Sequence, residues 1–342
     1  MLFVVFVAVC AAASAQSVDE LYRLARQEGE VSLYGGGPAS VYTGWAKLFE
    51  EKYPGIKVRV TGGFSNRLAV DIDAQRKAGK LDADLAMLQT IQDFERWRRE
   101  GALAVYRPEG FDHIPASFKD PDGAYVGIQV FALSYGFNTK AVDEGERPRS
   151  AQDFLHPRFA GKIISTYPHD DDVTLYLYDG IVRKYGWGFM EGLMKNRPQF
   201  VQGHLGVSQK VASGEFPVTF DTVLSFTLME KRRGAPTDVQ IPMDIPMPIW
   251  AQTAAVFREA RHPNAARLYL AWYLSREQQH RMNRVGTWPT RADVEPPEGL
   301  KPLTEYNTAN DFRAFMRDEQ RIAELRKRFE QIIGHVGGPA YR

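Results

Sequence analysis

Residues 31–60 of the chain read VSLYGGGPASVYTGWAKLFEEKYPGIKVRV, and this stretch decides the fold class. The apolar run at residues 31–34 predicts a buried strand, and Gly35-Gly36-Gly37-Pro38 predicts a loop after it. Apolar residues then recur at helical spacing, at Val41, Trp45, Leu48 and Phe49. Ile56, Val58 and Val60 alternate as a second strand. A strand, a helix and a strand in this order are typical of a βαβ unit with parallel strands.

The same alternation continues along most of the chain. Further strands are expected at residues 84–88, 162–165 and 217–220, and further helices at residues 68–78, 91–99, 171–184, 187–195, 207–213 and 223–233. A helix begins after Ser17, where Ser17 and Glu20 form a capping-box pattern. The C-terminal part is mostly helical, with one long charged helix at residues 312–333.

Two extended segments interrupt the alternation. Residues 125–137 are long for one strand and carry no helical period, and residues 238–250 hold prolines and methionines among alternating apolar residues. We interpret them as the two crossings between lobes. The predicted fold is therefore α/β, with two lobes of mixed, mainly parallel sheet flanked by helices and joined by a two-segment hinge. Lobe 1 is expected to comprise residues 16–130 plus 250–342, and lobe 2 residues 131–249.

The composition excludes several classes of protein. A chain of 342 residues with 44% hydrophobic positions has enough apolar material for about two ordinary domains. Its 43 Lys and Arg against 42 Asp and Glu give a formal net charge of +1. Because binding of nucleic-acid backbones depends on excess positive charge, no nucleic-acid partner is predicted.

The N-terminal sequence favours an export signal. Residues 2–13 form an apolar run that is too short to span a bilayer but is typical of a signal peptide, although no Lys or Arg precedes it. Ala13-Ser14-Ala15 fits the small residues at which such peptides are cleaved. We therefore expect a periplasmic or secreted product, cleaved after Ala15. The only cysteine, Cys10, would leave with the leader.

Candidate ligand-binding residues follow four predicted strands. Ligands of open α/β sheets bind outside the carboxyl ends of the strands, where helix N-termini present free N–H groups. Two of the four junctions fall in each half of the chain, which favours a small molecule clamped between two lobes. The candidates at these junctions are Tyr34, Gly35 and Gly36; Gln89 and Thr90; Thr166; and Asp221 and Thr222. Trp250, at the end of the second crossing, is interpreted either as core or as a wall of the pocket.

The densest polar cluster is His169-Asp170-Asp171-Asp172, at a helix start. Aspartates in this position stabilise a helix by about 0.3–1 kcal/mol each, so part of the cluster is explained by capping. We also predict that His169, Asp170 and Asp171 face the ligand and accept hydrogen bonds from its hydroxyl or amino groups. Neighbouring residues in one loop do not have zinc-ligand spacing, so no metal site and no cofactor is predicted.

Two alternatives to a simple solute receptor stay open. A metal carrier would use His169, Asp171 and Asp221, and an exported enzyme would use His169 with a carboxylate as acid and base. The sequence contains no G-x-S-x-G, no H-E-x-x-H and no cysteine after the leader, so the usual hydrolase signatures are missing. The other histidines, His204 among them, are scattered, and we interpret them as structural. The chain is predicted not to be an enzyme.

Seven stretches of the sequence resemble the extracellular solute-binding proteins of ABC importers, in the branch described as iron(III)-transport-like. They are Val31-Ser32-Leu33-Tyr34-Gly35-Gly36, Phe49-Glu50-Glu51-Lys52-Tyr53-Pro54-Gly55-Ile56-Lys57-Val58, Asp82-Ala83-Asp84-Leu85, Tyr135-Gly136-Phe137-Asn138-Thr139, Phe159-Ala160-Gly161-Lys162-Ile163, Val211-Ala212-Ser213-Gly214-Glu215 and His262-Pro263-Asn264-Ala265-Ala266. The resemblance implies the type II periplasmic-binding-protein fold. It also implies that a monomer captures a small solute and delivers it to a membrane permease.

The sequence departs from the ferric-ion-binding members of that family at one place. Those members carry two adjacent tyrosines after the strand that corresponds to residues 217–220, because phenolates are good ligands for Fe(III). Here the same place reads Asp221-Thr222-Val223-Leu224. We therefore expect an organic solute rather than bare Fe(III).

Overall fold

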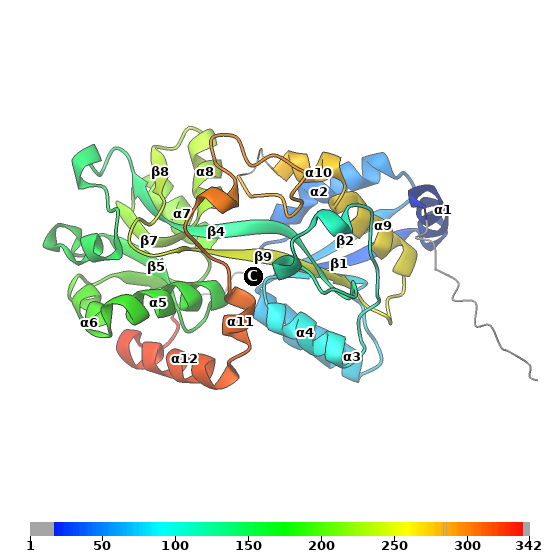
Figure 1. Ribbon diagram of the computed structural model, residues 1–342, viewed down its shortest axis with the longest axis horizontal. Coiled ribbons are helices and arrows are strands. Elements are labelled where there is room, and N and C mark those ends of the chain that lie inside the picture. Colours follow the sequence, from blue (N-terminus) through cyan, green and yellow to red (C-terminus); the bar gives the residue numbers. More distant parts are fainter. Residues whose placement is uncertain (1–16, 283, 285, 338–342) are drawn as a thin grey trace, which may run out of the picture.

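The computed structural model describes residues 17–282, 284 and 286–337, so the predicted leader with Cys10 lies outside the described part. Two groups of helices and strands lie side by side, and two long strands, β4 and β9, run from one group to the other (Figure 1). The expected α/β architecture of two lobes joined by two crossings is confirmed. Within the described residues, no helix is both long enough and apolar enough to cross a membrane.

The first lobe begins with alternating helices and strands, as predicted. Its elements are α1 (Val18–Glu28), β1 (Glu30–Gly36), α2 (Ser40–Lys52), β2 (Lys57–Gly63), α3 (Ser65–Lys77), β3 (Leu85–Leu88) and α4 (Ile91–Arg99). β1 lies between β2 and β3 and is parallel to both. The oxygen of Ser17 accepts a hydrogen bond from the Glu20 N–H at 3.2 Å, which confirms the predicted start of α1.

The glycines after residue 34 do not form the predicted loop. Gly35 and Gly36 continue β1 and pair with Gly62 and Gly63 of β2. A Cβ atom on Gly36 would lie 2.2 Å from the Ser65 hydroxyl oxygen. The missing side chains therefore allow close packing inside the lobe, because the space beside the strand is already filled.

A pair of glycine substitutions tests this packing. We expect Gly36→Ala to lower the free energy of unfolding by about 1–3 kcal/mol, because the added methyl group overpacks the strand edge. The control is Gly44→Ala within α2, where a Cβ meets nothing within 4 Å. That change should raise stability by about 0.5–1 kcal/mol, because alanine favours helix. Urea denaturation measures both free energies of unfolding. An equal effect of the two changes would contradict the close packing around Gly36.

The second lobe has the same kind of alternation. Its elements are β5 (Ile163–Thr166), α5 (Asp172–Tyr185), α6 (Gly188–Lys195), β6 (Gln199–Val201), α7 (His204–Ser213), β7 (Val218–Val223), α8 (Leu224–Arg232) and β8 (Thr237–Gln240). β5 lies between β6 and β7 and is parallel to both. The short strand β6 was not predicted. β7 runs on to Val223, so Asp221 and Thr222 lie inside the strand and not after it.

β4 (Val126–Asn138) and β9 (Met247–Val256) form the hinge. The second crossing lies later in the chain than the predicted residues 238–250, because residues 237–240 form β8 and pair with β4 in the second lobe. They pair antiparallel from Val126 opposite Ala254 to Ala132 opposite Ile249. Beyond this stretch β4 pairs with β7 and β8 of the second lobe, whereas the other end of β9 pairs with β3 of the first. The strand order in the described part is β2-β1-β3-β9-β4-β7-β5-β6. Each hinge strand thus belongs to both lobes; the residue boundaries given above for the lobes stay a prediction.

The C-terminal region departs from one expectation. After α9 (Pro263–Tyr273) and α10 (Arg276–Met282), the expected single helix at residues 312–333 is divided into α11 (Phe312–Met316) and α12 (Glu319–Ile333). Asp318 separates them, because its carboxylate accepts a hydrogen bond from the Arg321 N–H at 3.0 Å and caps α12. The short strand β10 (Thr308–Ala309) precedes α11 and pairs with β9.

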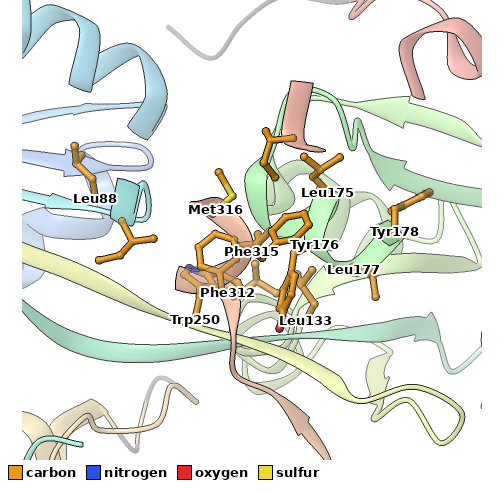
Figure 2. Packing of buried hydrophobic residues seen from close by; sticks show 14 of the residues in the cluster. Leu88, Leu133, Leu175, Tyr176, Leu177, Tyr178, Trp250, Phe312, Phe315 and Met316 are labelled. Carbon is orange, nitrogen blue, oxygen red and sulfur yellow. The ribbon is translucent and has the colours of Figure 1, made fainter. Parts of the chain in front are cut away.

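One apolar core runs through both lobes on the side of α11. Figure 2 shows Phe312, Phe315 and Met316 of α11 between Leu88 of β3 and Tyr176 of α5. The ring of Tyr176 lies 5.0 Å from that of Phe315. The C-terminal region therefore fills the space between the lobes on this side, and Tyr176 and Tyr178 are buried packing residues.

Candidate functional site: a polar junction between the lobes

A fully buried carboxylate organises the second lobe where its strands end. Asp221 of β7 has 0% of its surface exposed and accepts a hydrogen bond from the Thr166 N–H of β5 at 3.0 Å. The hydroxyl of Thr174, on the first turn of α5, donates to the same carboxylate at 3.0 Å. Because a buried charge is stable only when it is paired and hydrogen-bonded, this arrangement fixes the ends of β5, β7 and α5 relative to one another.

His204, the first residue of α7, completes this buried group. Its Nε2 atom lies 3.1 Å from the Thr174 hydroxyl oxygen and 3.4 Å from an Asp221 carboxylate oxygen. Its Nδ1 atom lies 3.9 Å from the Asp171 carboxylate. Burial lowers the pKa of His204, but the charges of Asp171 and Asp221 outweigh this effect and leave the pKa above its usual value.

Direct contacts join the two lobes beside this group. The Gln89 side chain, which follows β3 of the first lobe, donates to the Asp171 carboxylate at 3.3 Å. In the first turn of α4, Gln92 donates to the Asp172 carboxylate at 2.9 Å. The other oxygen of Asp171 accepts from the Val173 and Thr174 N–H groups at 3.0 Å and caps α5. We call Gln89, Thr166, Asp171, Thr174, His204 and Asp221 the junction cluster.

Four of the predicted ligand-binding residues lie in the junction cluster, and the others do not. Gln89, Thr166, Asp171 and Asp221 are brought together as expected. The Tyr34 hydroxyl bonds to Asp82 and Gln75 inside the first lobe, and Gly35 and Gly36 are close-packed within β1. Thr222 faces away from Asp221 along β7 and bonds to Ser208 at 2.7 Å.

Thr90, His169 and Asp170 lie outside the junction cluster. Thr90 is the buried N-cap residue of α4. The ring of His169 packs edge-on against Tyr167 at 5.3 Å, and burial lowers its pKa. Asp170 accepts a hydrogen bond from Gln202 at 2.7 Å. None of these contacts tests whether the residues bind a ligand, so that remains a prediction.

The structure places His204, and not His169, between Asp171 and the buried Asp221. Two features of the sequence could have identified His204 as a candidate: it follows Gly203, and it is the first residue of a helix that comes after a strand. The strand was missed because β6 has only three residues, and the start of α7 was expected at residue 207. Without that strand, the histidine did not fall at a strand-to-helix junction.

Trp250 lines a small cavity beside the start of α4 and the start of α11. The cavity has a volume of about 30 Å³, and Ile91, Phe118 and Phe312 also line it. Because one water needs roughly 10–15 Å³ of such space, it holds only a few waters. The Trp250 ring is stacked on Phe131 at 5.4 Å and is 4% exposed, so the interpretation as core residue fits the structure.

Comparison with known proteins decides the family. A model of the bacterial extracellular solute-binding proteins matches residues 82–312, which is more than half of the chain. The chain belongs to this family. The family is one of binding proteins, which confirms the resemblance noted in the sequence. No curated protein matches the chain.

Solved structures show the same fold as this solute-binding protein. The periplasmic binding protein P5PA is 22% identical, with a TM-score of 0.74, and the match covers 89% of this chain and 99% of that one. AfuA from Actinobacillus pleuropneumoniae, with fructose-6-phosphate bound, is 21% identical with a TM-score of 0.76, over 89% and 98% of the two chains. Iron-bound HitA from Pseudomonas aeruginosa is 20% identical with a TM-score of 0.71, over 88% and 99%.

The described part of the chain contains few groupings of metal-ligating side chains. No group of three or more His, Cys, Asp or Glu there is arranged to hold a metal ion. The carboxylate of Asp221 already accepts hydrogen bonds from the hydroxyl groups of Thr166 and Thr174. Its oxygens therefore act as acceptors for the protein itself.

The raised pKa of His204 gives the solute-binding protein a pH-dependent stability. The folded pKa is above the unfolded value of about 6.5, so the folded state binds the proton more tightly. This contribution to stability is complete below the unfolded pKa and is lost as the pH rises through the folded pKa. We therefore expect the melting temperature of the wild type, relative to His204→Gln, to fall as the pH is raised above about 6.5. If the melting temperatures of the two proteins changed in parallel between pH 5 and 9, the pKa of His204 would not be raised in the folded state.

Proposed function

We propose that this solute-binding protein captures one small polar organic solute at the junction cluster, by closure of its two lobes about the β4–β9 hinge. The hydrogen bond between Gln89 of one lobe and Asp171 of the other carries the proposal. It joins the carboxyl end of β3 to the start of α5, and ligands of such sheets bind at the ends of strands.

The buried polar group behind this contact supports the same site. Replacing a buried charged network with apolar residues is often neutral or stabilising, so such a network is poorly explained by stability alone. Asp171 uses one oxygen to cap α5, and its other oxygen faces Gln89 and His204. A solute that donates hydrogen bonds would take its place at this second oxygen, with Gln89 as a neighbouring donor and acceptor.

The charge of the site favours hydroxylated or amino solutes. With His204 protonated, the two aspartates and the imidazolium carry a net charge of −1. Hydroxyl and ammonium groups are donors to carboxylates, whereas a bare anion would meet the charge of Asp171. Among the solved structures above, one holds a sugar phosphate and another iron. Release of a metal from purified protein would favour the metal-carrier alternative.

The cellular role follows from the family and the leader. We propose that residues 1–15 direct export, that the mature chain works as a monomer outside the cytoplasm, and that it delivers its solute to the permease of an ABC importer. The exported location is consistent with the extracellular family to which the chain belongs.

A matched pair of capping variants tests the site. Asp171→Ser removes the carboxylate but keeps an oxygen that can cap α5, and Asp318→Ser makes the same change at the start of α12. The assay is the thermal shift caused by a panel of sugars, polyols, amines, amino acids, phosphate esters and metal salts. We expect the compound that stabilises the wild type to bind Asp318→Ser with the same affinity. Its affinity for Asp171→Ser should be at least tenfold lower. Equal affinity in all three proteins would place the site elsewhere.

A further inference from the structure

The C-terminal residues 311–333 lie across both lobes, and we call them the strap. The strap comprises Asp311, α11 and α12, with Arg317 and Asp318 between the helices. In Figure 1 α11 lies between the two lobes, and α12 lies below α5. α11 contacts α4 of the first lobe and α5 of the second, as well as the hinge strand β9.

One carboxylate joins the strap to the first lobe. Glu95 of α4 is 7% exposed and accepts hydrogen bonds from two arginines of the strap. Arg313 Nε lies 2.5 Å from it, and Arg317 reaches both of its oxygens with Nε at 2.9 Å and a terminal nitrogen at 2.6 Å. Burial raises the pKa of Glu95, but the hydrogen bonds from Arg317 and Arg313 outweigh this and leave it lowered, so the carboxylate is charged.

The strap is attached to the second lobe through a wider set of contacts. Arg321 lies 2.5 Å from Asp179, which is 2% exposed, and Arg326 pairs with Asp172. The buried ring of Phe329 packs against Tyr178 at 5.6 Å and against Trp187 at 5.0 Å. These ion pairs and buried aromatic contacts anchor α12 to the second lobe.

On the first-lobe side, the strap is separated from part of α4 by a groove. The groove has a volume of about 450 Å³ and is lined by residues of α4, such as Gln92 and Arg99, and of the strap, such as Met316 and Ile322. Contact between the strap and α4 is therefore concentrated at Glu95 and at the apolar residues of α11. A movement of the first lobe away from the second would separate Glu95 from both arginines.

We propose that the strap is a latch that stabilises the closed arrangement of the lobes through Glu95, Arg313 and Arg317. The latch lies on the α11 side of the hinge and none of its residues belongs to the junction cluster. It therefore sets how much of the protein is closed before any solute binds, which in turn sets the apparent affinity, since only the closed state binds tightly. The latch is independent of the identity of the solute, and its test requires none.

The distance between the lobes, measured without added solute, tests the latch. Cys10 is the only cysteine and precedes the mature chain proposed here, so cysteines placed at Val70 of α3 and Lys195 of α6, both exposed, can be labelled selectively. Distances between the labels are measured by single-molecule fluorescence transfer. In Glu95→Gln and in Arg317→Gln we expect the ratio of open to closed molecules to rise about tenfold, a typical coupling between two states.

Two further variants separate a latch from simple packing. Arg321→Gln breaks the ion pair with Asp179, which has the same length, 2.5 Å, as the pair between Arg313 and Glu95. Because Asp179 lies in the second lobe, to which α12 is attached, the distances between the two labels should stay those of the wild type. Arg317→Lys, which keeps a positive charge opposite Glu95, should keep part of the closed population that Arg317→Gln loses. Unchanged distances in both Glu95→Gln and Arg317→Gln, or the same opening in Arg321→Gln, would overturn the proposal. Failure of the solute assay above would leave this result unaffected.

Discussion

Replacing Asp221 by alanine is expected to lower the free energy of unfolding by about 3–5 kcal/mol. The change leaves the Thr166 N–H and the Thr174 hydroxyl without their acceptor, and it leaves His204 without one of its two carboxylate neighbours. Because Asp221 is fully buried, water cannot replace the lost partner without a rearrangement of β5, β7 and α5. Urea denaturation monitored by circular dichroism measures the change.

The control for this change is an exposed carboxylate of the same lobe. Asp238 pairs with Lys231 at 2.6 Å, and their side chains are 32% and 50% exposed. Asp238→Ala should cost about 0–1 kcal/mol, because exposed ion pairs contribute little. If Asp221→Ala unfolded at the same urea concentration as Asp238→Ala, the buried network would not hold the second lobe together.

Replacing Trp250 by alanine is expected to cost about 3–5 kcal/mol as well, for a different reason. Trp250 is 4% exposed, lies on a hinge strand and is stacked on Phe131 of the other. The truncation would enlarge the small cavity beside Phe312 in the core that both lobes share. Thermal and urea denaturation measure the loss.

A conservative substitution separates packing from solute contact at this position. Trp250→Phe keeps an aromatic ring against Phe131 and should retain most of the stability that Trp250→Ala loses. It should also leave solute affinity unchanged, because Trp250 is not part of the junction cluster. A large loss of affinity in a stably folded Trp250→Phe protein would show that the tryptophan is a wall of the binding site.

The fold could be predicted because it depends on local patterns that repeat. The period of apolar residues defined α2 and α4 closely, and the long extended stretch at β4 indicated a crossing between lobes. The errors occurred where a side chain or a neighbouring strand decides the local structure. Asp318 divides the C-terminal helix by capping α12, and Gly35 and Gly36 stay in β1 because β2 pairs with them.

The junction cluster could be predicted only in part, for a physical reason. Strand ends identified Gln89, Thr166 and Asp221, because a parallel sheet brings such ends to one edge. The partner His204 is 33 residues from Asp171 in sequence and begins a helix that follows a three-residue strand. Which histidine faces two aspartates depends on how α5 and α7 pack on the sheet, and neither spacing nor composition encodes that contact.

Native mass spectrometry of gently purified protein tests the central claim most directly. We expect that wild-type protein carries one small organic molecule per chain, that Asp318→Ser carries it in the same proportion, and that Asp171→Ser has lost it. Retention of the same molecule in Asp171→Ser would contradict the account, because it would place solute binding away from the junction between the lobes. A bound metal ion in place of an organic molecule would contradict the proposed solute class.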